Sequence, residues 1–148
     1  MKQLGRLIYI VVIVLRFGLD EVALSAFDRA ADPTWYPGQL SSGAGIWAPL
    51  KLYQFEIARE IFEGWDAPLA GVPRERLSAV IDTSEHVETK LSAFYCHRTQ
   101  MKDVRRILER PGYREFARLE TYVLARTRLP GLPLPEDDLL AGISDDEQ

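Results

Sequence analysis

The stretch Leu7-Ile-Tyr-Ile-Val-Val-Ile-Val-Leu15 decides the expected fold. Its nine residues are mostly β-branched, and an apolar run without polar alternation is typical of a strand covered on both faces. A membrane helix needs about 20 apolar residues, and this run ends at Arg16. A cleaved signal or anchor stays open as an alternative, although the acidic pair Asp20-Glu21 is unusual before the cleavage site at Ala23-Leu24-Ser25. The pattern therefore predicts a buried strand over residues 7–15.

Helices and further strands follow this run. Apolar periodicity predicts strands over 50–57 and 78–82, and helices over 19–31, from Asp82 through Tyr95, over 101–109 and over 113–128. Residues 58–77 are ambiguous, and the stretch 130–148, rich in proline and acidic residues, is expected to be a mobile tail. Strands that alternate with helices are typical of an α/β layered fold with a mainly parallel sheet. We expect one such domain over residues 1–148.

Composition narrows the class of protein. The chain has 148 residues, of which 47% are hydrophobic and 27% charged, as in ordinary soluble globular proteins. The net charge of −4 and the pI of about 5.2 argue against a nucleic-acid partner. Cys96 is the one cysteine, which excludes an intrachain disulfide and fits a reducing compartment. We therefore expect a cytoplasmic protein that does not span a membrane.

The chain has few residues of the types that bind a catalytic metal or act as nucleophiles. A catalytic zinc takes about three protein ligands, and the chain has two histidines, His86 and His97, with no paired-histidine or Cys-x-x-Cys motif. His97 adjoins Cys96, and neighbouring helical residues point apart. His86 and Cys96 are ten positions apart, about 15 Å along a straight helix. The sequence therefore predicts no metal site and no catalytic set, and Cys96 is expected to be a small buried residue.

Several segments follow one another in a characteristic order. They are Phe17-Gly-Leu-Asp20, Ala26-Phe-Asp-Arg-Ala-Ala-Asp-Pro33, Trp47-Ala-Pro-Leu-Lys-Leu-Tyr53, Ile81-Asp82 before a helix that ends in Cys96-His-Arg-Thr-Gln100, and Glu120-Thr-Tyr122. Over residues 10–128 this order resembles the carboxy-terminal part of the LmbE/PIG-L family of de-N-acetylases. The resemblance implies a truncated Rossmann-like (LmbE-like) layered fold, with a mainly parallel sheet and a helical carboxy-terminal part. It also implies zinc-dependent hydrolysis of an N-acetyl group on an amino-sugar conjugate.

The sequence departs from this family where the metal is bound. The family's Ala-His-Pro-Asp-Asp-Glu motif is absent, and its His-Pro-Asp-His motif is missing where Asp20 runs on into Glu21. The resemblance carries over only to His97, Thr99 and Gln100, and to Asp20 in the turn, as positions that line the substrate pocket or support the ligands. From the residues alone, His97 is better explained as a helix-terminal histidine, and Asp20 fits a helix N-cap as well as it fits a site role. We expect no cofactor in this chain, whereas the intact family binds zinc.

Two functional hypotheses follow. The first is a truncated or diverged de-N-acetylase that is inactive alone, and the alternative is a non-catalytic binding or interaction domain that retains the fold. An amino sugar is the expected ligand, and the aromatic residues Trp35, Tyr36, Trp47 and Tyr53 either line a sugar-sized pocket or belong to the core. Loss of the first strand–helix unit would expose one edge of strand 7–15. We therefore expect self-association, or a partner chain that covers this strand.

Overall fold

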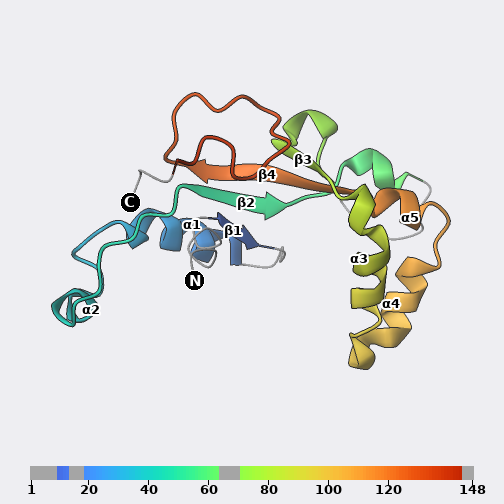
Figure 1. Ribbon diagram of the computed structural model, residues 1–148, viewed down its shortest axis with the longest axis horizontal. Helices are drawn as coiled ribbons and strands as arrows, with labels where there is room; N and C mark the ends of the chain where they lie inside the picture. Colours follow the sequence, from blue (N-terminus) through green and yellow to red (C-terminus); the bar gives the residue numbers. More distant parts are fainter. Residues whose placement is uncertain (1–9, 14–18, 64–70, 145–148) are drawn as a thin grey trace.

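A computed structural model describes residues 10–13, 19–63 and 71–144 of the protein (Figure 1). Its strands are β1 (Ile10–Ile13), β2 (Lys51–Phe55), β3 (Ala79–Asp82) and β4 (Leu119–Thr127). Its α-helices are α1 (Leu19–Ala30), α2 (Pro37–Ser41), α3 (Val87–Phe94), α4 (Met101–Leu108) and α5 (Tyr113–Phe116). The described residues also form the 3₁₀ turns η2 (Arg59–Phe62), η3 (Arg74–Arg76), η4 (Ser84–His86) and η5 (Arg98–Gln100).

The described strands form one sheet in the order β1-β2-β4-β3. The last strand in sequence, β4, lies between β2 and β3 and is antiparallel to both, so that Leu124 faces Tyr53 and Tyr122 faces Ala79. Four residues of β1 add a parallel pairing along the other edge of β2. The prediction of a mainly parallel sheet is therefore wrong, because the body of the sheet, β2-β4-β3, is fully antiparallel.

The helices do not form layers over this sheet, so the predicted Rossmann-like layered fold is also wrong. Helices α3 and α4 extend away from one end of the sheet, and α2 lies beyond the other end (Figure 1). A parallel sheet needs crossover helices between its strands, whereas the described residues between β2 and β3 form the 3₁₀ turns η2 and η3. None of the described helices is both long and apolar enough to cross a membrane.

Both faces of the antiparallel sheet carry apolar side chains. One cluster contains Tyr53, Ala79 and Tyr122, with Phe55, Ile81, Leu124 and Leu139 packed against it. The other contains Ala58, Val72 and Leu77, with Ile61, Val80 and Val123. Successive residues of β4 thus alternate between two covered faces, as strand geometry requires. A third cluster, built on Val87, Tyr113 and Ala117, lies at the base of α3.

Several predicted elements are confirmed. Strands occur within 50–57 and 78–82, and helices within 19–31, 82–95 and 101–109. The strand predicted over 7–15 is confirmed over 10–13, and its other residues lie outside the described part of the chain. The helix predicted over 113–128 is wrong, because it ends after the four residues of α5 and the rest forms β4.

The segment after β4 returns across the sheet. The N–H of Val80 donates to the carbonyl oxygen of Glu136 at 2.9 Å, and the N–H of Glu136 donates to that of Ser78 at 2.9 Å. Leu129 and Glu136 are buried. These contacts differ from the mobile tail expected over 130–148. Residues 145–148 lie outside the described part.

Candidate functional site

The structure separates the four site residues that the sequence singles out. His97 precedes η5, and Thr99 and Gln100 lie within it, in the turn between α3 and α4. Asp20 is the second residue of α1, inside the helix and not at its N-cap. Helix α1 lies beside β1, well away from the far end of α3 (Figure 1). Asp20 and the motif that contains His97, Thr99 and Gln100 therefore belong to different parts of the molecule.

The turn after α3 is open to solvent. His97 and Thr99 are exposed, and the His97 ring lies beside the Phe94 ring, with 6.4 Å between centroids. The backbone N–H of His97 donates to the Phe94 carbonyl at 3.1 Å, which agrees with the helix-terminal position considered for this histidine. Cys96 is exposed and not buried as predicted, with its Sγ 3.8 Å from the Ser92 carbonyl oxygen.

The described side chains do not fit a zinc ion. Among them, no group of three or more His, Cys, Asp or Glu residues lies close enough to hold a metal. His86 precedes α3 and His97 follows it, so the whole helix separates the two imidazoles. The zinc implied by the family resemblance thus has no ligand set in the described part of this chain.

A second candidate site is a cavity of about 730 Å³ between α1 and the segment that follows it, which we call the aromatic pocket. Small-molecule sites in proteins are commonly of this size. The exposed apolar side chains of the first half of the described chain all line it: Val22 (63% exposed), Trp35 (40%), Tyr36 (68%) and Ile46 (56%). Because apolar groups gathered around one hollow are typical of binding sites, the aromatic pocket is a candidate ligand site.

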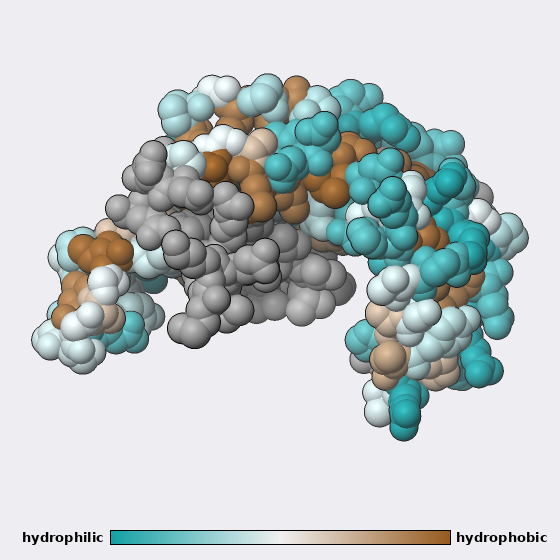
Figure 2. Space-filling view, in the orientation of Figure 1, coloured by the Kyte–Doolittle hydropathy of each residue, from teal (hydrophilic) through white to brown (hydrophobic). Residues whose placement is uncertain are grey.

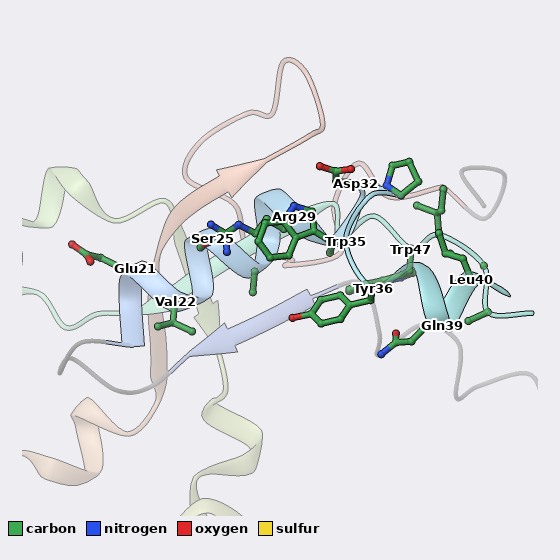
Figure 3. Close-up of a pocket in the computed structure, with 16 residues that line it drawn as sticks. Glu21, Val22, Ser25, Arg29, Asp32, Trp35, Tyr36, Gln39, Leu40 and Trp47 are labelled. Carbon is green, nitrogen blue, oxygen red and sulfur yellow. The ribbon is translucent and has the colours of Figure 1, made fainter. Parts of the chain in front are cut away.

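Figure 3 shows the walls of the aromatic pocket. Helix α1 contributes Arg29, and residues 32–47 contribute Trp35, Tyr36 and Trp47. The guanidinium carbon of Arg29 lies 4.1 Å from the centroid of the Trp35 ring, a cation–π contact. The Trp35 and Tyr36 rings lie 6.3 Å apart at 54°. The two aromatic faces are therefore held at an angle, and a charged donor lies on one of them.

Tyr36 has an unusual backbone. Its φ of 57° places it in the left-handed region, which residues with a side chain rarely adopt. Such conformations cost about 1–3 kcal/mol and concentrate at functional sites. The left-handed residue directly precedes α2 and is largely exposed, so local strain accompanies an aromatic side chain presented to the pocket.

Asp32 supplies a negative charge at the rim. Its Oδ1 accepts hydrogen bonds from the Thr34 hydroxyl at 2.7 Å and from the Thr34 N–H at 2.8 Å. These two bonds hold the pKa of the Asp32 carboxyl below its ordinary value. The pocket therefore offers a carboxylate and a guanidinium beside aromatic faces at neutral pH.

The sequence left open whether four aromatic residues line a sugar-sized pocket or belong to the core, and the structure places three of them at one cavity. Trp35, Tyr36 and Trp47 line the cavity, whereas Tyr53 is fully buried in the sheet, with its ring edge-on to Tyr122. The contribution of Arg29 was missed. It lies in the last turn of α1, six residues before Trp35, and this spacing carries no local signal of a contact.

Comparisons with protein-family models, with curated protein sequences and with solved structures find no match to this chain.

Proposed function

We propose that this chain is a truncated or diverged unit of the LmbE/PIG-L type, which does not cleave an amide by itself. The observation that carries the proposal is the order of its segments, ending in Cys96-His-Arg-Thr-Gln100, together with a total of two histidines. Three ligands are needed for a hydrolytic zinc site. Deacetylation would therefore require a second chain that supplies the missing His and Asp ligands.

The position of the motif supports this proposal. His97 and Thr99 are exposed in the turn between α3 and α4, where a second chain can reach them without unfolding this one. The proposal rests on the order of the motifs and not on the sheet, which differs from the one that the resemblance implies. It needs this turn to face the complementing chain.

Zinc content and amide hydrolysis test the proposal. The purified chain, alone and together with a chain carrying an Ala-His-Pro-Asp-Asp-Glu motif, is assayed on an N-acetylglucosamine conjugate. We expect zinc and activity only in the combination. His97→Ala should lower the combined activity, and His86→Ala, at the other end of α3, is the matched control. Stoichiometric zinc in the chain alone, or inactivity of the combination, contradicts the proposal.

A second candidate function is the binding of an amino-sugar ligand without catalysis, and the aromatic pocket favours it. Pyranose rings present C–H faces suited to Trp and Tyr, while their hydroxyl and amide groups need polar partners. Trp35 and Tyr36 provide such faces, and Arg29 and Asp32 provide a donor and an acceptor. This candidate places the ligand beside α1, away from the turn that contains His97.

Titration with methyl N-acetylglucosaminide, followed by calorimetry, tests this candidate. Trp35→Ala should weaken binding by at least about tenfold, equivalent to about 1.4 kcal/mol. Tyr95→Ala removes an aromatic side chain that is also exposed (51%) but lies at the end of α3, outside the pocket. It should therefore leave binding unchanged. Equal effects of both substitutions, or no binding by the unaltered chain, contradict an aromatic sugar site.

A further inference from the structure

Positive charge is concentrated in one part of this acidic protein. Residues 97–118 contain seven Lys or Arg and three Asp or Glu, a net charge of +4, in a chain whose net charge is −4. The rest of the chain therefore carries −8. Such a separation of charge within one domain favours association through oppositely charged surfaces.

Part of this positive region is exposed on η5 and α4. Arg98, Lys102, Arg105 and Arg106 are exposed, and their spacing of three and four residues places them along one side of the helical stretch. Exposed apolar side chains accompany them, namely Phe94 (37%), Tyr95 (51%) and Ile107 (44%). We call these seven residues the basic patch. Figure 2 shows hydrophilic surface interrupted by brown apolar areas over these helices.

The segment after β4 has the complementary character. Asp137 and Asp138 are exposed there, between Leu134 (55% exposed) and Leu140 (41%). Residues 136–147 contain six acidic residues and no Lys or Arg. We call Leu134, Asp137, Asp138 and Leu140 the acidic patch. Each patch thus combines exposed apolar groups with charges of one sign.

The two patches do not meet within one molecule. The segment after β4 runs over the sheet on one side, while α3 and α4 project on the other side from its far end (Figure 1). The four cations of the basic patch form no ion pair with any described carboxylate. The Asp138 carboxylate accepts a short-range hydrogen bond from the Leu140 N–H at 2.8 Å.

We infer that the basic patch of one copy docks on the acidic patch of a second copy. Two copies related by a two-fold axis make this contact twice, so the dimer closes. Charge complementarity sets the orientation of the two copies. The apolar side chains of both patches become buried in the interface, away from water. This interface is separate from the edge of β1 and does not depend on the proposed function. Because Arg98 adjoins His97, a second copy docked here would compete with a complementing chain for the turn between α3 and α4.

A charge-swap experiment tests this dimer. The hairpin variant changes the basic patch on the helical hairpin α3–η5–α4 and is K102E/R105E/R106E. The tail variant changes the acidic patch in the segment after β4, here called the tail, and is D137K/D138K. Light scattering and sedimentation at low and high ionic strength measure the dimer dissociation constant for the unaltered chain and for each variant. We expect a dimer that weakens as salt rises. Each variant alone should raise the dissociation constant at least tenfold, because its two patches then carry the same sign.

An equimolar mixture of the two variants provides the sharpest readout. In that heterodimer the now acidic hairpin of one copy faces the now basic tail of the other copy. At the second contact, the unaltered basic patch faces the unaltered acidic patch. Both contacts therefore regain opposite charges. We expect dimers to return in the mixture. The variant E60K/E63K makes the same charge change as the tail variant at exposed positions outside both patches, and it should dimerise like the unaltered chain. Circular dichroism confirms that every variant is folded.

Four outcomes overturn the inference. The first is an unaltered chain that stays monomeric at all concentrations. The second is a dimer insensitive to both reversals, which points to the edge of β1. The third is a mixture that does not associate. Binding of the hairpin to anionic vesicles or to RNA without dimerisation also overturns it, since the basic patch would then serve another partner.

Discussion

Lys51 and Glu136 form an ion pair inside the protein, with 2.5 Å between Nζ and Oε1 and side-chain exposures of 0% and 1%. The hydroxyl of Tyr53 donates to the other carboxylate oxygen of Glu136. Burial, together with this hydrogen bond, raises the pKa of Tyr53 above its ordinary range. The pair joins β2 to a segment 85 residues further along the chain. That segment is therefore part of the folded domain.

Replacing Glu136 with Gln should destabilise the protein by about 3–5 kcal/mol. The substitution leaves the Lys51 ammonium buried without its counter-charge, and breaking a buried pair on one side costs about this much. Urea denaturation measures the change. Glu63→Gln makes the same chemical change at an exposed residue and should stay within about 0.5 kcal/mol. Equal midpoints for the two variants would show that the pair has no stabilising role.

Gly71→Ala should also lower stability, by about 1–3 kcal/mol. A methyl group at this position would lie 2.6 Å from the Cα of Arg59 and 2.6 Å from the carbonyl oxygen of Ile57, both backbone atoms. The backbone would have to shift where Val72 pairs with Ala58. Gly45→Ala is the matched control, because nothing lies within 4 Å of its added methyl group. Thermal melts of the two variants decide the point, and a tolerated Gly71→Ala would contradict this close approach.

Low pH should weaken the stabilisation that Glu120 provides through its contacts with Lys90 and Tyr122. Partial burial raises the pKa of Glu120, but hydrogen bonds from Tyr122 at 2.6 Å and from Lys90, whose Nζ lies 3.1 Å away, outweigh burial and leave the pKa below its ordinary 4.5. A lowered carboxyl pKa stabilises the fold fully above that value, and the stabilisation disappears as the pH falls through the folded pKa.

Denaturation across a pH series tests this linkage with Glu120→Gln. The difference in stability from the unaltered chain should be below about 1 kcal/mol at neutral pH, since the pair is partly exposed. It should shrink as the pH falls below about 4.5. A difference that stays constant down to low pH would falsify the linkage.

Arg128→Ala should loosen the attachment of α1 to the sheet. Its Nη2 donates to the Phe27 carbonyl at 2.8 Å, and its Nε donates to the Pro49 carbonyl at 3.1 Å. The guanidinium also lies 4.8 Å from the Phe27 ring centroid. Loss of these contacts should cost about 1–2 kcal/mol. Because Arg126 lies 3.7 Å from Asp28 in an exposed pair, Arg126→Ala should have a smaller effect, measured by the same melts.

The sequence predicts most of the helices and strands, but it does not predict how the strands pair. Helical spacing of Phe116, Leu119, Tyr122 and Val123 suggested a long helix, yet Thr121, Tyr122 and Val123 also favour strands. Both faces of β4 are covered, so the strand shows no alternation of apolar and polar residues. Hydrogen bonds on both of its edges then outweighed a weak helical periodicity.

The candidate site is predictable only in part. Aromatic residues close in sequence, Trp35, Tyr36 and Trp47, were recognised as a group, because a loop rich in Gly and Pro keeps them near one another. The contact between Arg29 and Trp35 depends on how the chain turns after α1. The left-handed conformation of Tyr36 has no sequence signal, since a tyrosine rarely adopts it.

The central place of β4 has a consequence for synthesis of the protein. Strands β2 and β3 pair with β4 and not with each other, and β4 is the last of the four to leave the ribosome. Until residues 119–127 emerge, the β4-facing edges of the nascent β2 and β3 have no partner, and unpaired edges are prone to aggregation. A chaperone that holds such edges during translation would therefore act after residues 79–82 emerge and before residues 119–127 do.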